Sequence, residues 1–189
     1  MGLDITAHSN LKFSEDQDEE NYDLIRIWKN GHFPDHCELE EGNWETTADS
    51  HSHSFRAGSY SGYNHFRKIL AMCTLGVDID TVWANEDNYA YQPFFNLLNF
   101  SDCEGSIGPK YSAELYNDFV DNRDRFIRNL KQEIDFTKET ENPLALEPEF
   151  ILPDVFELSD DDIQYYIEKY DDWTLAFELA KDGGVVQFH

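Results

Sequence analysis

The stretch from Ser50 to Val77, SHSHSFRAGSYSGYNHFRKILAMCTLGV, contains neither Asp nor Glu, although the chain has 39 acids among 189 residues. At that density the stretch would be expected to hold about six acids. It carries instead Arg56, Arg67, Lys68 and three of the seven histidines. A chain of net charge −25 therefore has one electropositive segment, which is where we expect an anion to bind.

The remainder of the chain is strongly acidic. A net charge of −25 repels nucleic acid and anionic membranes, so we expect neither direct nucleic-acid binding nor membrane association. The partners that fit this charge are basic proteins, cations, or a small anionic ligand shielded inside a pocket. A well-solvated surface that keeps the protein soluble is the alternative explanation of the same acids. The oligomeric state is not predicted.

Length and periodicity predict a single α+β domain over residues 1–189, with enough aromatic side chains, 15%, for a real core. Period-two alternation and period-3.6 spacing predict a mixed or antiparallel sheet with N- and C-terminal strands, flanked by three to four helices. We expect strands at 3–13, 24–29, 43–47 and 185–188, and helices at 61–75, 93–100, 109–131 and 160–181. The segments 14–49 and 132–158 are expected to be acidic surface excursions, and residues 77–90 a connection with some strand character that leads into a polar loop.

Three cysteines without a CxxC pair indicate free thiols in a reducing compartment. The first residues, MGLDITAHSN, contain no basic region followed by an apolar run, which is the pattern of a signal peptide. No stretch approaches the roughly 18 continuous apolar residues that span a bilayer. We therefore expect a cytoplasmic protein, in the host cytoplasm if a phage encodes it.

Residues 56–62, RAGSYSG, are predicted to enter a helix and to form an anion cradle. In this hypothesis Arg56 binds a phosphate or carboxylate, and aromatic rings stack on the ligand. The loop 99–108 is predicted to form the other side of the pocket. The loops 53–64 and 99–108 would then face each other around a small anionic, nucleotide-like ligand. The predicted ligand-binding residues are Arg56, Ser59, Tyr60, Ser61, Tyr63, Asn64, Asn99, Ser101, Asp102 and Glu104. In the alternative interpretation Ser61 caps the helix and Arg56 pairs with an acid.

The same loops offer weak candidates for metal binding or catalysis. His51, His53 and Cys103 could hold a divalent metal, although no second spaced pair of ligands accompanies them. Cys103 is a poor nucleophile between two acids, because negative charge raises the pKa of a thiol. Asp102 or Glu104 could act as a general base, which makes a hydrolase an alternative function. The absence of a catalytic motif argues against an enzyme, and no cofactor is predicted.

The segment from Asp182 to His189 offers one further candidate site. If its terminal strand pairs beside Leu3–Ala7, His189 comes close to Asp4 and His8. The alternative is an ordinary glycine helix stop followed by an edge strand.

Four blocks of the chain resemble one known family. They are MGLDITA (1–7), HSFRAGSYSGYNHF (53–66), FFNLLNFSDCEGSIGP (94–109) and AFELAKDGGVVQFH (176–189). They are similar to uncharacterised proteins of phages, prophages and some bacteria that begin MGLDITA and end DGG-x-V-x-FH. The resemblance covers roughly half of the chain and implies a phage-type accessory role, including counter-defence. Beside the small-ligand hypothesis it leaves open an acidic inhibitor that covers a basic surface of a host protein, as a nucleic-acid mimic would.

Overall fold

The N-terminal strand β1 (Gly2–His8) organises the molecule because its side chains alternate between the core and the opposite face. Leu3, Ile5 and Ala7 are fully buried, whereas Asp4 is exposed. This is the period-two pattern of a strand with one buried face. The computed structural model describes residues 2–18, 20–100, 104–131 and 158–189.

β1 lies inside a four-stranded antiparallel sheet, sheet A, with the order β5-β1-β7-β6. Its other strands are β5 (Ser52–Ser59), β6 (Gly105–Ile107) and β7 (Val185–Phe188). The predicted pairing of the terminal strand with β1 is confirmed, with Ile5 opposite Phe188 and Ala7 opposite Val186. Because β5 and β6 form the two edges of sheet A, the segments 53–59 and 105–107 lie at opposite sides of it.

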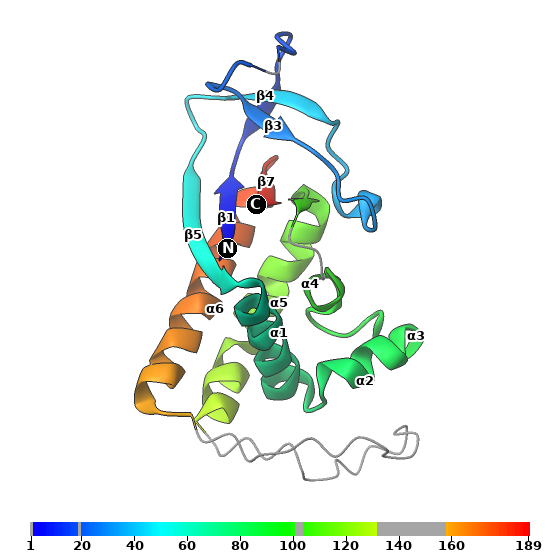
Figure 1. The fold of residues 1–189 in the computed structure, drawn as a ribbon, viewed down its shortest axis with the longest axis vertical. Coiled ribbons are helices and arrows are strands. Elements are labelled where there is room, and N and C mark those ends of the chain that lie inside the picture. Colours follow the sequence, from blue (N-terminus) through cyan, green and yellow to red (C-terminus); the bar gives the residue numbers. More distant parts are fainter. Residues whose placement is uncertain (1, 19, 101–103, 132–157) are drawn as a thin grey trace.

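A second antiparallel sheet, sheet B, stands at one end of the molecule (Figure 1). Its strands, in the order β2-β4-β3, are β2 (Leu11–Phe13), β4 (Gly42–Thr46) and β3 (Ile25–Ile27). The prediction of one strand over 3–13 is wrong, because Asn10 has a positive φ of 51° that separates β1 from β2. The excursion expected at 14–49 contains β3 and β4 of sheet B and the short 3₁₀ helix η1 (Pro34–His36). A small core of Ile27, Cys37 and Val185 packs this segment against sheet A.

Six α-helices complete the part of the chain that the structure describes, and the three long ones pack side by side below sheet A in Figure 1. They are α1 (Tyr60–Leu75), α2 (Ile79–Ala84), α3 (Glu86–Tyr89), α4 (Phe95–Asn99), α5 (Pro109–Leu130) and α6 (Asp160–Ala180). The connection expected at 77–90 is corrected to α2 and α3. Asp78 caps α2 by accepting a hydrogen bond from Asp80 N, and Ile79 and Val82 are buried.

The core lies between sheet A and the long helices, with Trp173 of α6 at its centre. Trp173 is fully buried, and its ring contacts Phe55, Tyr63, Phe177 and Phe188 at centroid distances of 5.1 to 5.7 Å. These rings come from β5, α1, α6 and β7. The α+β fold class, with an antiparallel sheet and flanking helices, is confirmed.

Candidate functional site

The predicted loop 53–64 is a strand that passes directly into a helix. β5 ends at Ser59, and α1 begins at Tyr60. Ser59, rather than Ser61, is the N-cap, because its Oγ accepts a hydrogen bond from Gly62 N at 3.0 Å. The Ser61 hydroxyl lies 2.9 Å from Ser59 Oγ, and Tyr60 is exposed. The hydroxyls predicted to bind a ligand therefore already cap the helix.

Tyr63 and Asn64 face into the protein, which corrects the expectation that Tyr63 stacks on a ligand. Tyr63 is buried and donates its hydroxyl hydrogen to Phe100 O at 3.0 Å. Asn64 accepts a hydrogen bond from the buried Arg67, which also donates to Leu98 O at 2.7 Å. The two predicted loops thus meet through backbone carbonyls of 98–100, in the core rather than around a cavity. Asn99 is half-buried at the end of α4.

Glu104 and Arg56 lie at opposite edges of sheet A, since β1 and β7 separate their strands. Three strand spacings correspond to about 14 Å, too far for both to hold one small ion. Ser101, Asp102 and Cys103 lie outside the described residues, so their predicted roles stay predictions. Glu104 is exposed, and its carbonyl accepts a hydrogen bond from Asn30.

The positive N-terminus of α5, which follows the loop 99–108, already has an anion of its own. Glu38 Oε1 accepts a hydrogen bond from Lys110 N at 2.5 Å, and His36 O accepts one from Gly108 N at 2.8 Å. A Cβ on Gly108 would meet the Glu38 carboxylate, so a larger residue here would displace that carboxylate from the helix end. Glu38 therefore occupies the place that an anionic ligand would take at this helix end.

The face of sheet A turned away from the helices carries a row of polar side chains. Asp4 of β1 lies opposite Arg56 of β5. The backbone of Asp4 also exchanges two hydrogen bonds with the backbone of His189, which follows β7. Arg56 Nη1 and Asp4 Oδ1 are 4.0 Å apart, and the two side chains are 62% and 61% exposed. Trp28 packs edge-on against the His189 ring at 5.3 Å. The predicted approach of His189 to Asp4 is confirmed; its functional reading stays a prediction.

His8 belongs to the same face, where its Nδ1 lies 2.7 Å from Ser52 Oγ. Burial lowers the pKa of His8, and the neighbouring His189 lowers it further. Burial also lowers the pKa of His189, against the opposing effect of Asp4. Both imidazoles are therefore neutral at pH 7, and Arg56 remains the fixed positive charge on this face, with Asp4 as its counter-charge.

On the opposite face of β5, a small ionic cluster links the strand to α6. His53 Nε2 lies 3.3 Å from Asp172 Oδ1, and Lys169 Nζ lies 3.1 Å from Asp172 Oδ2. The predicted metal candidate His53 thus has a carboxylate partner, while His51 is exposed and bonds through its backbone to Ser9. In the residues that the structure describes, no three His, Cys, Asp or Glu side chains gather in a way that could hold a metal ion.

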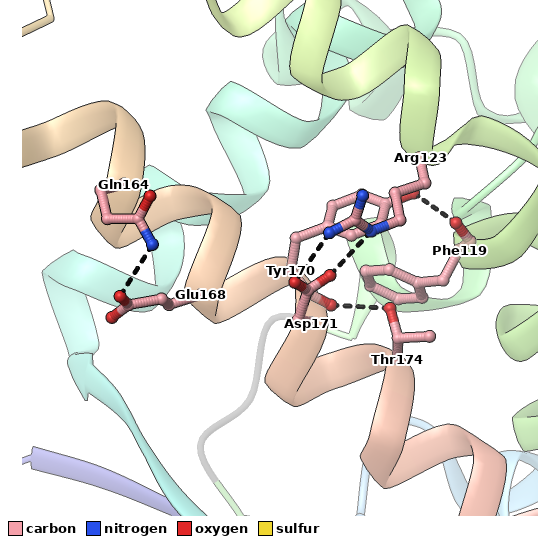
Figure 2. A network of polar contacts seen from close by, with 7 residues as sticks. All are labelled: Phe119, Arg123, Gln164, Glu168, Tyr170, Asp171 and Thr174. Carbon is pink, nitrogen blue, oxygen red and sulfur yellow. Dashed lines mark hydrogen bonds and ion pairs between the residues drawn. The ribbon is translucent and has the colours of Figure 1, made fainter. Parts of the chain in front are cut away.

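α6 carries polar contacts on both of its sides (Figure 2). Toward α5, Arg123 donates two parallel hydrogen bonds to Asp171, each 2.9 Å long. Nearer the start of α6, Gln164 donates to Glu168 of the same helix at 2.9 Å. The sequence analysis did not select Glu168 or its neighbours. The polar residues of the predicted helix 160–181 recur at helical spacing. This pattern could have identified its exposed face from the sequence.

Comparisons with protein-family models, with curated proteins and with solved structures found no match for this chain. Within the described ranges, no helix combines the length and the apolar character needed to cross a membrane. The fold and the site therefore define an acidic α+β protein, and its function has to be inferred from its own residues.

Proposed function

We propose that this protein is a binding module whose partner is a basic protein. The observation that carries the proposal is that α6 still exposes several acids beyond those that form ion pairs. Arg123 pairs with Asp171, Lys169 with Asp172 and Lys181 with Asp182, at 2.9, 3.1 and 3.8 Å. α6 still exposes the acids Asp160, Asp161, Asp162, Glu168 and Glu178.

Carboxylates fixed along a helix present a regular negative surface, as a nucleic-acid backbone does. Such a surface attracts a basic partner over a distance and speeds its association. The resemblance to phage proteins supports a basic host protein, including one that binds nucleic acid, as the target in a counter-defence role. The chain of net charge −25 would cover that protein's basic surface.

The test is capture of proteins from a lysate on the immobilised chain over a salt series. We expect basic proteins to be retained at about 50 mM salt and released by about 500 mM, where screening is nearly complete. The triple variant Asp161→Asn, Glu168→Gln and Glu178→Gln should retain less basic protein than the parent chain does. A control with Asp80→Asn, Glu86→Gln and Asp87→Asn on α2 and α3 removes the same charge elsewhere. Retention that does not change with salt would refute the proposal.

A second candidate function is favoured by the row of Arg56, Asp4 and His189. Arg56 could bind the phosphate of a nucleotide-like ligand, while Asp4 accepts a hydrogen bond from a sugar hydroxyl. The neutral His8 and the Ser52 hydroxyl add polar contacts along the same face. This candidate keeps Arg56 as the anchor of the predicted anion site, but on the sheet face rather than between two loops.

Thermal stability in the presence of a nucleotide panel tests this candidate. A ligand that binds only the folded state raises the melting temperature, and Arg56→Ala should remove that rise while Arg56→Lys retains part of it. Arg125→Ala, which removes an exposed arginine of α5, is the control. Ligand protection that is equal in Arg56→Ala and in the parent protein would exclude this site. A hydrolase would in addition turn the ligand over and lose that turnover in Asp102→Asn.

A further inference from the structure

β5 is an edge strand whose outer backbone groups are open. Ser9 N donates to His51 O at 3.0 Å, which fixes the register at the start of the pair with β1. In an antiparallel ladder, bonded residues alternate along each strand. His53 and Phe55 therefore direct their N–H and C=O groups toward β1, and Ser52, Ser54 and Arg56 direct theirs outward. No described residue bonds to these outward groups.

The open part of β5 is short. The register with β1 shifts between Leu3 and Asp4, where Ala57 is an extra residue on β5. This bulge twists the end of the strand, and so protects residues 57–59 from pairing with another chain. Residues 52–56 contain no proline and no acid, the features that commonly block an edge. An added strand could therefore pair over about five residues.

α6 runs beneath β5 in the opposite direction. Asp172 contacts His53, Lys169 lies over the Phe55 ring at 5.5 Å, and the Tyr165 hydroxyl lies next to Gly58. At 100° per residue, one stripe of α6 runs along the border of this contact: Tyr165 and Asp172 take part in it, and Asp161, Glu168 and Leu175 lie beside them on the helix surface. We define the α6 stripe as Asp161, Tyr165, Glu168, Asp172 and Leu175.

The α6 stripe combines acids with exposed apolar surface. Tyr165 and Leu175 are 42% and 40% exposed, which places them among the few large hydrophobic side chains left in contact with solvent. Figure 2 shows Glu168 nearer the start of α6 than the contact between Arg123 and Asp171, where it accepts a hydrogen bond from Gln164 of the same helix. A strand added beside β5 would place alternate side chains over this stripe.

We propose that β5 is the docking edge for an extended basic segment of the partner protein, which adds antiparallel or parallel to sheet A as a fifth strand. This inference rests on the proposed function and specifies where the partner binds. Backbone groups of residues 52, 54 and 56 supply the hydrogen bonds, and the α6 stripe selects Lys or Arg on the side chains that face the helix. Asp172 is already paired with Lys169 and His53, so the carboxylates that favour a basic occupant are the exposed Asp161 and Glu168. A second copy of this chain would instead bring two acidic α6 helices together.

The probe is a synthetic peptide of seven residues in which lysine and threonine alternate, KTKTKTK. In the proposed geometry the threonines share the face of Ser54, and their N–H groups point toward β5. The matched control, KPKPKPK, has the same charge but lacks those N–H groups. Binding of both is measured by calorimetry, and amide hydrogen exchange of the full chain is measured with and without each peptide.

We expect KTKTKTK to slow exchange at Ser52, Ser54 and Arg56 and to bind at least about tenfold more tightly than KPKPKPK, because proline removes several backbone hydrogen bonds. Ser54→Pro, which removes one outward N–H, should weaken KTKTKTK binding by a similar factor, while Ser54→Ala leaves it unchanged. Glu168→Gln should weaken it about two- to fivefold, and Glu86→Gln on α3 should leave it unchanged. The peptide comparison on the parent protein keeps the test valid even if Ser54→Pro fails to fold.

Equal affinity for the two peptides, with no slowed exchange on β5, would overturn the strand-addition proposal while the acidic binding surface of the proposed function stands. Failure of both peptides to bind at low salt would overturn both. Amide hydrogen exchange of β5 is also measured without peptide at increasing protein concentration. If exchange slows as the concentration rises, a second copy of the chain occupies the β5 edge, and the basic-segment proposal is overturned.

Discussion

Asp118 of α5 accepts a hydrogen bond from the backbone N–H of Phe94, with Oδ2 and N 2.7 Å apart. Phe94 is fully buried and has a positive φ of 65°. A residue with a side chain adopts this backbone conformation only at a steric cost of about 1 kcal/mol. Asp118 thereby holds the turn that starts α4, the segment whose carbonyls accept hydrogen bonds from α1.

The titration of Asp118 gives a first prediction. Burial raises the pKa of Asp118 to about 6, although the hydrogen bond from Phe94 opposes the shift. Because the folded state holds the proton more tightly than the unfolded state, this contribution to stability is present below about pH 4 and is lost as the pH rises through about 6. We expect a loss of about 1 kcal/mol after allowing for partial solvent exposure. Urea denaturation at several pH values measures it.

Asp118→Asn should remove this part of the pH dependence, so that its stability changes less than that of the parent protein between pH 4 and pH 7. Asp124→Asn, which removes an exposed acid of the same helix, is the control for the general charge repulsion. A pH profile of Asp118→Asn identical to that of the parent protein would contradict the assignment.

The contacts between α5 and α6 give a second prediction. The bonds from Arg123 to Asp171 are partly exposed, with side chains 43% and 48% accessible, whereas Tyr170 donates to Phe119 O at 2.7 Å in the core. Tyr170→Phe should lower the free energy of unfolding by about 1 to 1.5 kcal/mol, because a buried hydrogen bond is lost. Arg123→Met should lower it by less than about 1 kcal/mol, and only at low salt. Denaturation at two salt concentrations compares them, and a larger effect of Arg123→Met would contradict this ranking.

Glu38 provides a third prediction, because its carboxylate caps α5 from a distant part of the chain. Glu38→Ala should lower the free energy of unfolding by about 1 kcal/mol through loss of the cap and of the charge at the helix N-terminus. Glu38→Gln keeps an acceptor without the charge and should have a smaller effect. Glu40→Ala removes an exposed acid two residues away as a control. If Glu38→Ala matches that control in denaturation, Glu38 does not act as a cap.

The buried thiols give a fourth prediction. Burial raises the pKa of Cys37 to about 11 and that of Cys73 to about 12, so both are protonated at neutral pH. The two are free thiols, as the sequence analysis predicts. In a Cys103→Ser background, a thiol reagent should label Cys37 and Cys73 only at the rate at which the protein unfolds. Rapid labelling under native conditions would contradict their burial.

Local sequence patterns predicted most of the elements. The helices predicted at 109–131 and 160–181 are α5 and α6; Pro109 lies at the first position of α5, and a capping box of Ser159 and Asp162 starts α6. The short helices α2 and α3 were missed because four to six residues hold too little periodicity, and only the burial of Ile79 and Val82 identifies α2. Asn10 was missed as a strand break because asparagine gives a weak signal for a positive φ.

The predicted site was only partly recoverable from sequence. Arg56 is exposed in the structure, and its role in ligand binding stays a prediction. The proximity of His189 to Asp4 followed from the expected terminal strand. Tyr63 was misassigned as a ligand-stacking residue, although its spacing of three and seven residues from Phe66 and Leu70 indicates the buried face of the helix. Its hydroxyl finds Phe100 O only through a contact with a segment 37 residues away in the chain.

The sequence alone determined the net charge of −25, the acid-free segment, the helix caps and the alternation of β1. These depend on neighbouring residues, whose propensities and charges act locally. Only the tertiary structure decided that β5 lies at an edge, that Arg56 and Glu104 lie at opposite edges of sheet A, and that α6 brings Asp172 against His53 of β5. Such arrangements depend on which distant apolar faces pack together around Trp173, and that packing is a property of the whole chain.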